Sequence, residues 1–186
     1  MTPKEIIRWT ETQSEPLRKR WLSELQARSH VGLSPEGERL VAEFLDLFVE
    51  MLPGALGPYR REVAPLWRQA AELYGNFASQ RGLAAGEVIE EFHLLREAII
   101  GLLYKGGSSV GDEPVSLRDL LRLNRVVDTG VTMAAVGHTD ALFFALFQGS
   151  GVRSELDASL AEEIGEQLRA IQSEYHDILG YLDDTP

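Results

Sequence analysis

Apolar side chains recur at intervals of three or four residues along nearly the whole chain, and this spacing constrains the fold more than any other feature. Between residues 86 and 104, for example, they stand at Val88, Phe92, Leu95, Ile99 and Leu102. Such steps place side chains on one face of an α-helix, whereas a half-buried β-strand needs strict alternation. No stretch alternates convincingly, so the pattern predicts a helical protein.

Along the chain, the same spacing predicts six helices that are separated by segments rich in glycine and proline. Their expected bounds are about 3–28, 34–51, 65–81, 86–104, 116–147 and 153–182. Amphipathic helices with short connections bury their apolar faces against one another, which makes an all-α helical bundle. We expect residues 1–149 to form the bundle and residues 152–186 to form a long, coiled-coil-like amphipathic helix.

The expected last helix carries a narrow apolar seam. Its residues follow one another at steps of four, three, four, three and four: Ile164, Leu168, Ile171, Tyr175, Ile178 and Leu182. Two apolar positions in seven is the spacing of coiled coils. The seam therefore favours a homodimer in which this helix packs against a second copy and passes on a change in the bundle. The alternative is a helix that folds back as the last member of its own bundle.

The chain is acidic and contains no cysteine. Its net charge is −11, and nine of its 29 carboxylates follow residue 152, against two arginines. Such a surface repels nucleic acid and anionic membranes, so neither is an expected partner. A basic partner surface would explain the acid, and so would solubility alone. Without cysteine there are no disulfides, thiolate nucleophiles or cysteine-bound metals.

The remaining sequence features concern localisation. The N-terminal residues mix charges early and do not resemble a secretory signal. The longest apolar run, residues 141–147, is far shorter than the ~20 residues that a membrane span needs. We therefore expect a soluble, cytoplasmic protein without membrane insertion.

Four polar side chains stand on or beside apolar stripes and are candidates for ligand binding or for buried hydrogen bonds: His93, Arg96, Asp128 and His138. His138 interrupts the apolar face of the fifth helix, where a histidine can bind haem, sense pH or simply hydrogen-bond a neighbour. Arg96 and Asp128 are expected to pair across the bundle, because an unpaired buried charge is costly.

His176 opens the segment HDILGYL, which resembles the phospho-acceptor box of sensor histidine kinases. That box begins with histidine, an acid and an apolar residue. The match is partial, since Leu179 and Tyr181 replace expected polar residues, and the chain has no asparagine- and glycine-rich ATP-binding region. His176 is either a candidate phospho-acceptor or an exposed histidine on a solvated helix face.

No motif in the sequence requires catalysis. The chain contains no HExxH or paired Glu-x-x-His metal motif, no glycine-rich phosphate loop and no GxSxG nucleophile elbow. We therefore expect no enzyme activity, no catalytic residues, no metal and no cofactor.

Two motifs resemble a known family. Residues 86–96, GEVIEEFHLLR, are similar to the "EVxxEYxxLR" stretch of the N-terminal domain of RsbT co-antagonist proteins, and residues 123–128, LNRVVD, to that family's later "LxRxxD" helix. The resemblance implies a cytoplasmic helical sensor module without catalysis, found in stressosome proteins and at the front of some histidine kinases. Related stressosome domains are globin-like dimers without haem. Those proteins continue into a STAS domain or a kinase core, which this sequence does not contain.

Together these observations predict a non-enzymatic sensor domain of bacterial stress-response or two-component signalling. It would act as a homodimer on a protein signalling partner, with residues 1–149 as the sensor bundle and 152–186 as the dimerisation and signalling helix. Two alternatives stay open. One is a globin-like domain that binds haem or another small molecule through His93 or His138. The other is histidine phosphotransfer, or the truncated sensor region of a histidine kinase, through His176.

Overall fold

The computed structural model describes residues 3–28, 34–105, 109–110, 113–114, 116–147 and 158–183, and these residues form an all-α helical bundle. The helices are α1 (Pro3–Arg28), α2 (Pro35–Leu56), α3 (Arg60–Gln80), α4 (Ala85–Lys105), α5 (Leu117–Phe147) and α6 (Ala158–Asp183). Between α4 and α5, β1 (Ser109–Val110) pairs with β2 (Glu113–Pro114), and this two-residue antiparallel ladder places Ser109 opposite Pro114. The predicted fold class is confirmed.

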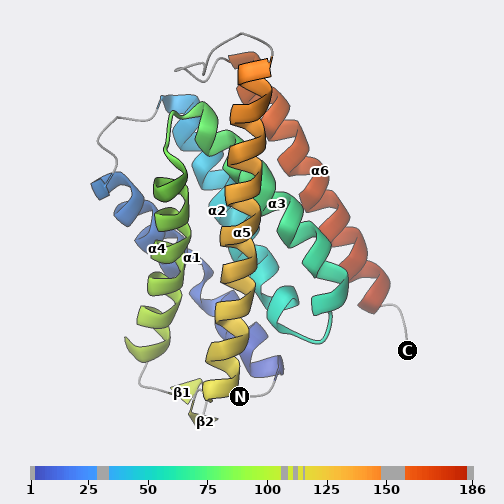
Figure 1. The fold of residues 1–186 in the computed structure, drawn as a ribbon. Coiled ribbons are helices and arrows are strands. Elements are labelled where there is room, and N and C mark those ends of the chain that lie inside the picture. The colour runs from blue at the N-terminus through green and yellow to red at the C-terminus, as the bar shows by residue number, and fades with distance from the viewer. Residues whose placement is uncertain are drawn as a thin grey trace.

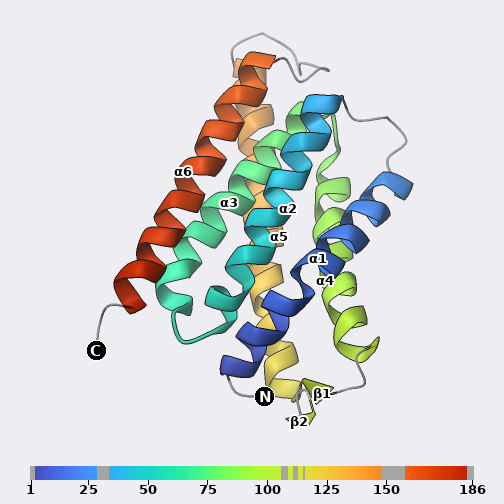
Figure 2. The ribbon, with the colours of Figure 1, turned by 180° about the vertical axis from the view of Figure 1, so that it is seen from behind.

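The helices surround one apolar interior. In Figure 1, α5 runs along the front of the molecule, between α4 and α3. Figure 2 shows the opposite side, where α1 crosses α2. α6 lies at the edge of the bundle, where it packs against α2 and α3.

Pro53 and Pro65 lie inside helices, as Pro16 does in α1, although the sequence had predicted a helix end near Pro53 and a helix start at Pro65. α2 continues through Pro53 to Leu56, and α3 begins at Arg60, five residues before Pro65. Proline costs a helix one backbone hydrogen bond, but burial of neighbouring side chains outweighs this loss near a helix end. Leu52 and Val63 are fully buried beside these prolines. The predicted bounds at 51 and 65 are therefore wrong.

Aromatic rings fill the centre of the bundle. Phe48 of α2 lies 5.2 Å from Trp67, 5.4 Å from Phe92 and 5.9 Å from Tyr74, measured between ring centroids, each in an edge-to-face arrangement. Edge-to-face contacts favour aromatic pairs beyond the area that they bury. α2, α3 and α4 are thereby joined at one point.

α3 and α5 approach each other to backbone contact. A Cβ on Gly75 would lie 1.9 Å from the carbonyl oxygen of Ala134, and one on Gly137 would lie 2.0 Å from the carbonyl oxygen of Glu72. Only glycine fits at these two positions. The crossing therefore fixes α5 against α3, and it sets the spacing of the side chains on both sides of it.

The seam of α6 packs within its own chain. Ile164, Leu168, Ile171 and Tyr175 are 2–3% exposed and belong to the same hydrophobic core as α2 and α3. Ile178 is half-buried against this core, and the side chain of Leu182 lies outside the described residues. The expectation that the seam faces a second copy is therefore corrected, because one chain already buries its apolar side chains. The expected division into a 1–149 bundle and a 152–186 signalling helix stays a prediction, although the described part of the second range, α6, packs on α2 and α3.

One described helix is long and apolar enough to cross a membrane. α5 passes by length and composition, with a mean hydropathy of 1.4 over its most apolar stretch. A single helix of this kind is weak evidence for a membrane span, and 22% of its most apolar stretch is buried inside the bundle. The buried side chains of α5, such as Leu123, Val127 and Ala134, belong to the core of the bundle, which is consistent with a soluble protein.

Candidate functional site

His138 hydrogen-bonds a neighbour, the simplest of the three roles considered for it. Its side chain is 2% exposed, and Nε2 lies 2.7 Å from the carbonyl oxygen of Leu83, in the turn between α3 and α4. Because a carbonyl only accepts, Nε2 carries the proton and Nδ1 is left buried without a partner. His138 thus ties α5 to this turn, and the nitrogen that makes the tie is not free to bind haem iron.

Arg96 and Asp128 form the predicted ion pair between α4 and α5. The Arg96 side chain is 25% exposed and that of Asp128 is 62% exposed, so the pair lies at the surface rather than in the interior. His93 is half-buried on α4. These side chains do not converge on one cavity.

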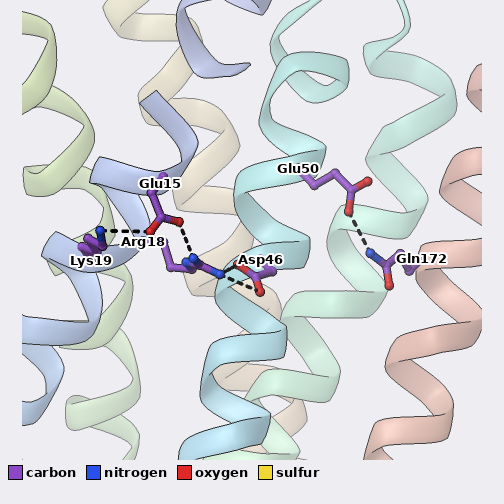
Figure 3. Close-up of polar contacts among 6 residues, drawn as sticks. All are labelled: Glu15, Arg18, Lys19, Asp46, Glu50 and Gln172. Atoms are coloured by element: carbon purple, nitrogen blue, oxygen red, sulfur yellow. Dashed lines mark hydrogen bonds and ion pairs between the residues drawn. The ribbon is translucent and has the colours of Figure 1, made fainter. Parts of the chain in front are cut away.

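His176 belongs to a group of α6 side chains that converge on Glu50 of α2. Its Nε2 lies 2.6 Å from one carboxylate oxygen of Glu50, and the Gln172 amide donates to the other at 2.9 Å. Tyr175 donates from its hydroxyl to the backbone carbonyl of Glu50. Figure 3 shows the Glu50–Gln172 contact, and beside it the ion pairs that join Arg18 of α1 to Asp46 of α2. The described contacts of His176 therefore attach α6 to α2.

A buried ion pair, which the sequence analysis did not predict, joins the end of α3 to α4. The guanidinium of Arg81 donates to both carboxylate oxygens of Glu91, at 2.9 and 3.1 Å. The Tyr74 hydroxyl donates to the same carboxylate at 2.6 Å. Only 6% of the Arg81 side chain and 10% of the Glu91 side chain are exposed.

Burial sets the electrostatics of this group. It raises the pKa of the Tyr74 hydroxyl well above its usual value, and the negative charge of Glu91 raises it further. Burial alone would lower the pKa of Arg81, but its interactions with Tyr74 and Glu91 raise that pKa overall. The group is therefore a neutral phenol beside a fixed ion pair, which holds helices together and offers no group poised for proton transfer.

A cavity of about 640 Å³ opens between the N-terminal halves of α3 and α5 and the end of α2. Five arginines line it: Arg60 and Arg68 from α3, and Arg118, Arg122 and Arg125 from α5. The remaining lining is mostly apolar: Ala55, Ala64, Trp67, Leu117, Leu121, Val126 and Thr129. This volume lies within the range of small-molecule sites.

The cavity is electrostatically unusual for an acidic chain. No carboxylate lines it, and none of its five arginines forms an ion pair within the described part of the chain. Arg122 alone is tethered, through a long contact of 3.5 Å from Nη1 to the carbonyl oxygen of Leu56. The cavity therefore presents cationic side chains that remain available to a ligand.

The floor of the cavity is apolar. Trp67 is 2% exposed, and its indole N–H donates to the carbonyl oxygen of Val126 at 3.0 Å. Because this bond occupies the only polar atom of the indole, Trp67 offers the cavity only its ring. Leu117 and Leu121, 72% and 50% exposed, stand at the rim.

The sequence analysis did not predict this cavity, although the spacing of its α5 arginines could have indicated one of its walls. Arg118, Arg122 and Arg125 follow at steps of four and three, so they share one face of a helix. Arg60 and Arg68 come from a different helix, and only the α3–α5 crossing brings the two sets together. Among the described residues, no group of three or more histidine, aspartate or glutamate side chains is arranged to hold a metal ion.

Comparison of the chain with protein-family models, with curated proteins and with solved structures found no match in any of the three.

Proposed function

We propose that this chain is a non-enzymatic sensor or regulatory domain that binds a small molecule in the cavity between α3 and α5. The observation that carries the proposal is the cavity itself, which is large enough for a metabolite, apolar on its floor and cationic on its walls. The described residues of its lining include no histidine, carboxylate or hydroxyl pair of the kind that acid–base or nucleophilic catalysis uses. Binding is the activity that such a lining supports.

The position of the cavity supports a signalling role. Its walls belong to α3 and α5, which touch backbone to backbone at Gly75 and Gly137. A ligand changes a protein only if it binds one packing of the helices better than another. A ligand that binds between α3 and α5 would therefore favour one packing of these two helices over another.

The resemblance of residues 86–96 and 123–128 to RsbT co-antagonist proteins gives this role its context. It supports a cytoplasmic module of bacterial stress-response or two-component signalling that acts as a homodimer on a protein partner. Because the α6 seam is buried within its own chain, the contact between two copies would use another surface. Phe143, Phe144, Leu146 and Phe147, at the end of α5, are 60–77% exposed, and exposed apolar clusters commonly mark protein–protein contacts.

A thermal-shift screen tests the proposal. Chemically diverse metabolites (cationic, neutral and anionic) are added to the full chain, to Ala64→Trp, which fills the cavity, and to Ala170→Trp, which adds the same side chain on the exposed face of α6. We expect at least one compound to raise the Tm of the full chain and of Ala170→Trp but not that of Ala64→Trp. If no compound raises the Tm, or if Ala64→Trp responds equally, the proposal is wrong.

Light scattering of the full chain tests the homodimer separately. We expect twice the mass of one chain at micromolar concentration. The mass of a single chain at every concentration would overturn the dimer while leaving ligand binding intact.

A further inference from the structure

We propose that the ligand of this cavity is a small amphiphilic anion, with a multiply charged phosphate-like group held by the arginines and an apolar body packed against Leu117 and Leu121. This inference rests on the proposed function and names the chemical class of the molecule sensed. It draws on charge, geometry and the apolar floor of the cavity, and each of these points to the same ligand.

The distribution of charge is the first argument. The chain has 18 lysines and arginines against 29 carboxylates. Five of those 18 cationic side chains line this one cavity, and no carboxylate from the described residues does. A solvated acidic surface would have interspersed carboxylates among them. Five neighbouring guanidinium groups without counter-charges repel one another, and a bound anion removes that repulsion.

The geometry is the second argument. Arg118, Arg122 and Arg125 form a stripe along α5, while Arg60 and Arg68 stand two helical turns apart on α3. The cations thus come from two walls, so a single anion between them contacts both helices. Guanidinium groups bind phosphate and carboxylate oxygens in pairs, which favours a group with several oxygens over a single charge.

The helix ends add to the positive field. α3 begins at Arg60, and its N-cap residue, Tyr59, makes no side-chain capping hydrogen bond. α5 begins at Leu117, whose side chain also lines the cavity. The N-terminal end of a helix carries partial positive charge. The N-terminal ends of both helices therefore lie in the same region as the arginines, and each first turn also holds one carboxylate, Glu62 in α3 and Asp119 in α5.

The apolar lining is the third argument, and it distinguishes this ligand from an inorganic ion. Trp67 offers only its ring, and Leu117 and Leu121 remain largely exposed at the rim. Trp67 is already buried by the bundle, but a free phosphate would leave Leu117 and Leu121 in water. A ligand with an apolar or aromatic body would cover them, and a cavity of about 640 Å³ has room for such a body beside the charged group.

Binding of such an anion would also change how α3 and α5 pack. By neutralising arginines on both helices, an anion favours packings in which the N-terminal halves of α3 and α5 stand close together. Without it, repulsion between the two walls favours packings that hold them apart. The anion is thus a clamp between α3 and α5, with the crossing at Gly75 and Gly137 as the fixed point.

A matched pair of fluorescent probes tests the charge requirement. Anilinonaphthalene sulfonate is an aromatic anion, and phenylnaphthylamine has nearly the same apolar body without charge. We expect the anion to bind the full chain at least about tenfold more tightly than the neutral probe, and pyrophosphate to displace it. Equal affinity for both probes, or no displacement by pyrophosphate, would overturn the inference.

Arg60 and Arg61 are adjacent in the sequence, but only Arg60 lines the cavity, so their variants form a matched pair. Arg60→Gln and Arg122→Gln remove a charge from the cavity, whereas Arg61→Gln removes one from the residue next to Arg60, which does not line it. We expect the first two to weaken binding of the sulfonate about tenfold each, with Arg61→Gln unchanged and the neutral probe unaffected throughout. An equal effect of Arg61→Gln would show a general response to net charge and would also overturn the inference.

Vesicles distinguish a lipid headgroup from a free anion, the two sources of this chemistry. Co-sedimentation with phosphatidylglycerol vesicles but not with phosphatidylcholine vesicles, lost on Arg122→Gln, assigns the site to a lipid headgroup. Displacement by pyrophosphate without co-sedimentation assigns it to a soluble anion. The thermal-shift screen gives a further outcome. If neutral or cationic compounds raise the Tm of the full chain but not that of Ala64→Trp, the ligand is not an anion, and the sensor proposal still holds.

Discussion

Arg81 and Glu91 form a two-point ion pair with N–O distances of 2.9 and 3.1 Å, almost entirely removed from water. The pair links the residue that follows α3 to the first half of α4, and Tyr74 completes it by donating to the same carboxylate. Because both charges are buried, each depends on the other. The cost of removing one partner is therefore the cost of leaving the other unpaired.

The first prediction concerns Glu91→Gln, which keeps the shape of the side chain and removes its charge. We expect the free energy of unfolding, measured in urea, to fall by about 3–5 kcal/mol, because Arg81 is left buried without a counter-charge. Glu43→Gln is the control, since it removes a surface ion pair with Arg39 and should cost no more than about 0.5 kcal/mol. Similar losses in the two variants would contradict a special role for the buried pair.

The second prediction concerns pH. Because the folded state raises the pKa of Tyr74, its contribution to stability is fully present below the usual value of 10.0 and is lost as pH rises above it. The unfolded chain then releases a proton that the folded chain retains. Stability should fall by about 1.4 kcal/mol per pH unit from this residue alone. Urea titrations between pH 8 and 11 would measure it.

Tyr74→Phe is the matched variant for this prediction. It should be less stable at pH 8, because it loses the hydrogen bond to Glu91. Its stability should then decline less steeply than that of the parent chain above pH 10. Parallel pH profiles of the two proteins would show that Tyr74 does not retain its proton on folding.

Apolar spacing predicted the all-α bundle, because one face of each helix must be buried whatever packs against it. Opposite charges beside apolar stripes likewise predicted that Arg96 and Asp128 would pair. Both predictions depend only on local pattern and on the cost of exposing or isolating a group. The first does not require knowing which helices are neighbours, and the second requires only that α4 and α5, which follow each other in the chain, lie side by side.

The failures share the opposite property. The spacing of the α6 seam shows which face of the helix is apolar. It does not show what covers that face, because a second copy and the chain's own α2 and α3 could bury it equally well. Pro53 and Pro65 follow local rules that burial of neighbouring residues outweighed. The arginine cavity needs Arg60 and Arg122 from separate helices, and their distance is set by packing at Gly75 and Gly137.

The third prediction tests that packing. A methyl group on Gly75 would collide with the backbone at Ala134, which cannot move aside as a flexible side chain would. We expect Gly75→Ala to cost about 3 kcal/mol or more of unfolding free energy. Gly180→Ala is the control, since nothing lies within 4 Å of its added methyl, and it should stabilise α6 by about 0.5–1 kcal/mol. Equal effects in the two variants would mean that α3 and α5 are not in backbone contact.

The fourth prediction decides where the α6 seam packs. Ile171 is 2% exposed within one chain, so Ile171→Ala should cost about 2–5 kcal/mol by leaving a cavity in the core. The Tm of the two proteins should then depend on protein concentration in the same way, because the lost contacts are within the chain. Exposed Glu174→Ala should leave the Tm nearly unchanged. If the Tm of the parent chain rises with concentration and that of Ile171→Ala does not, the seam is shared with a second copy after all.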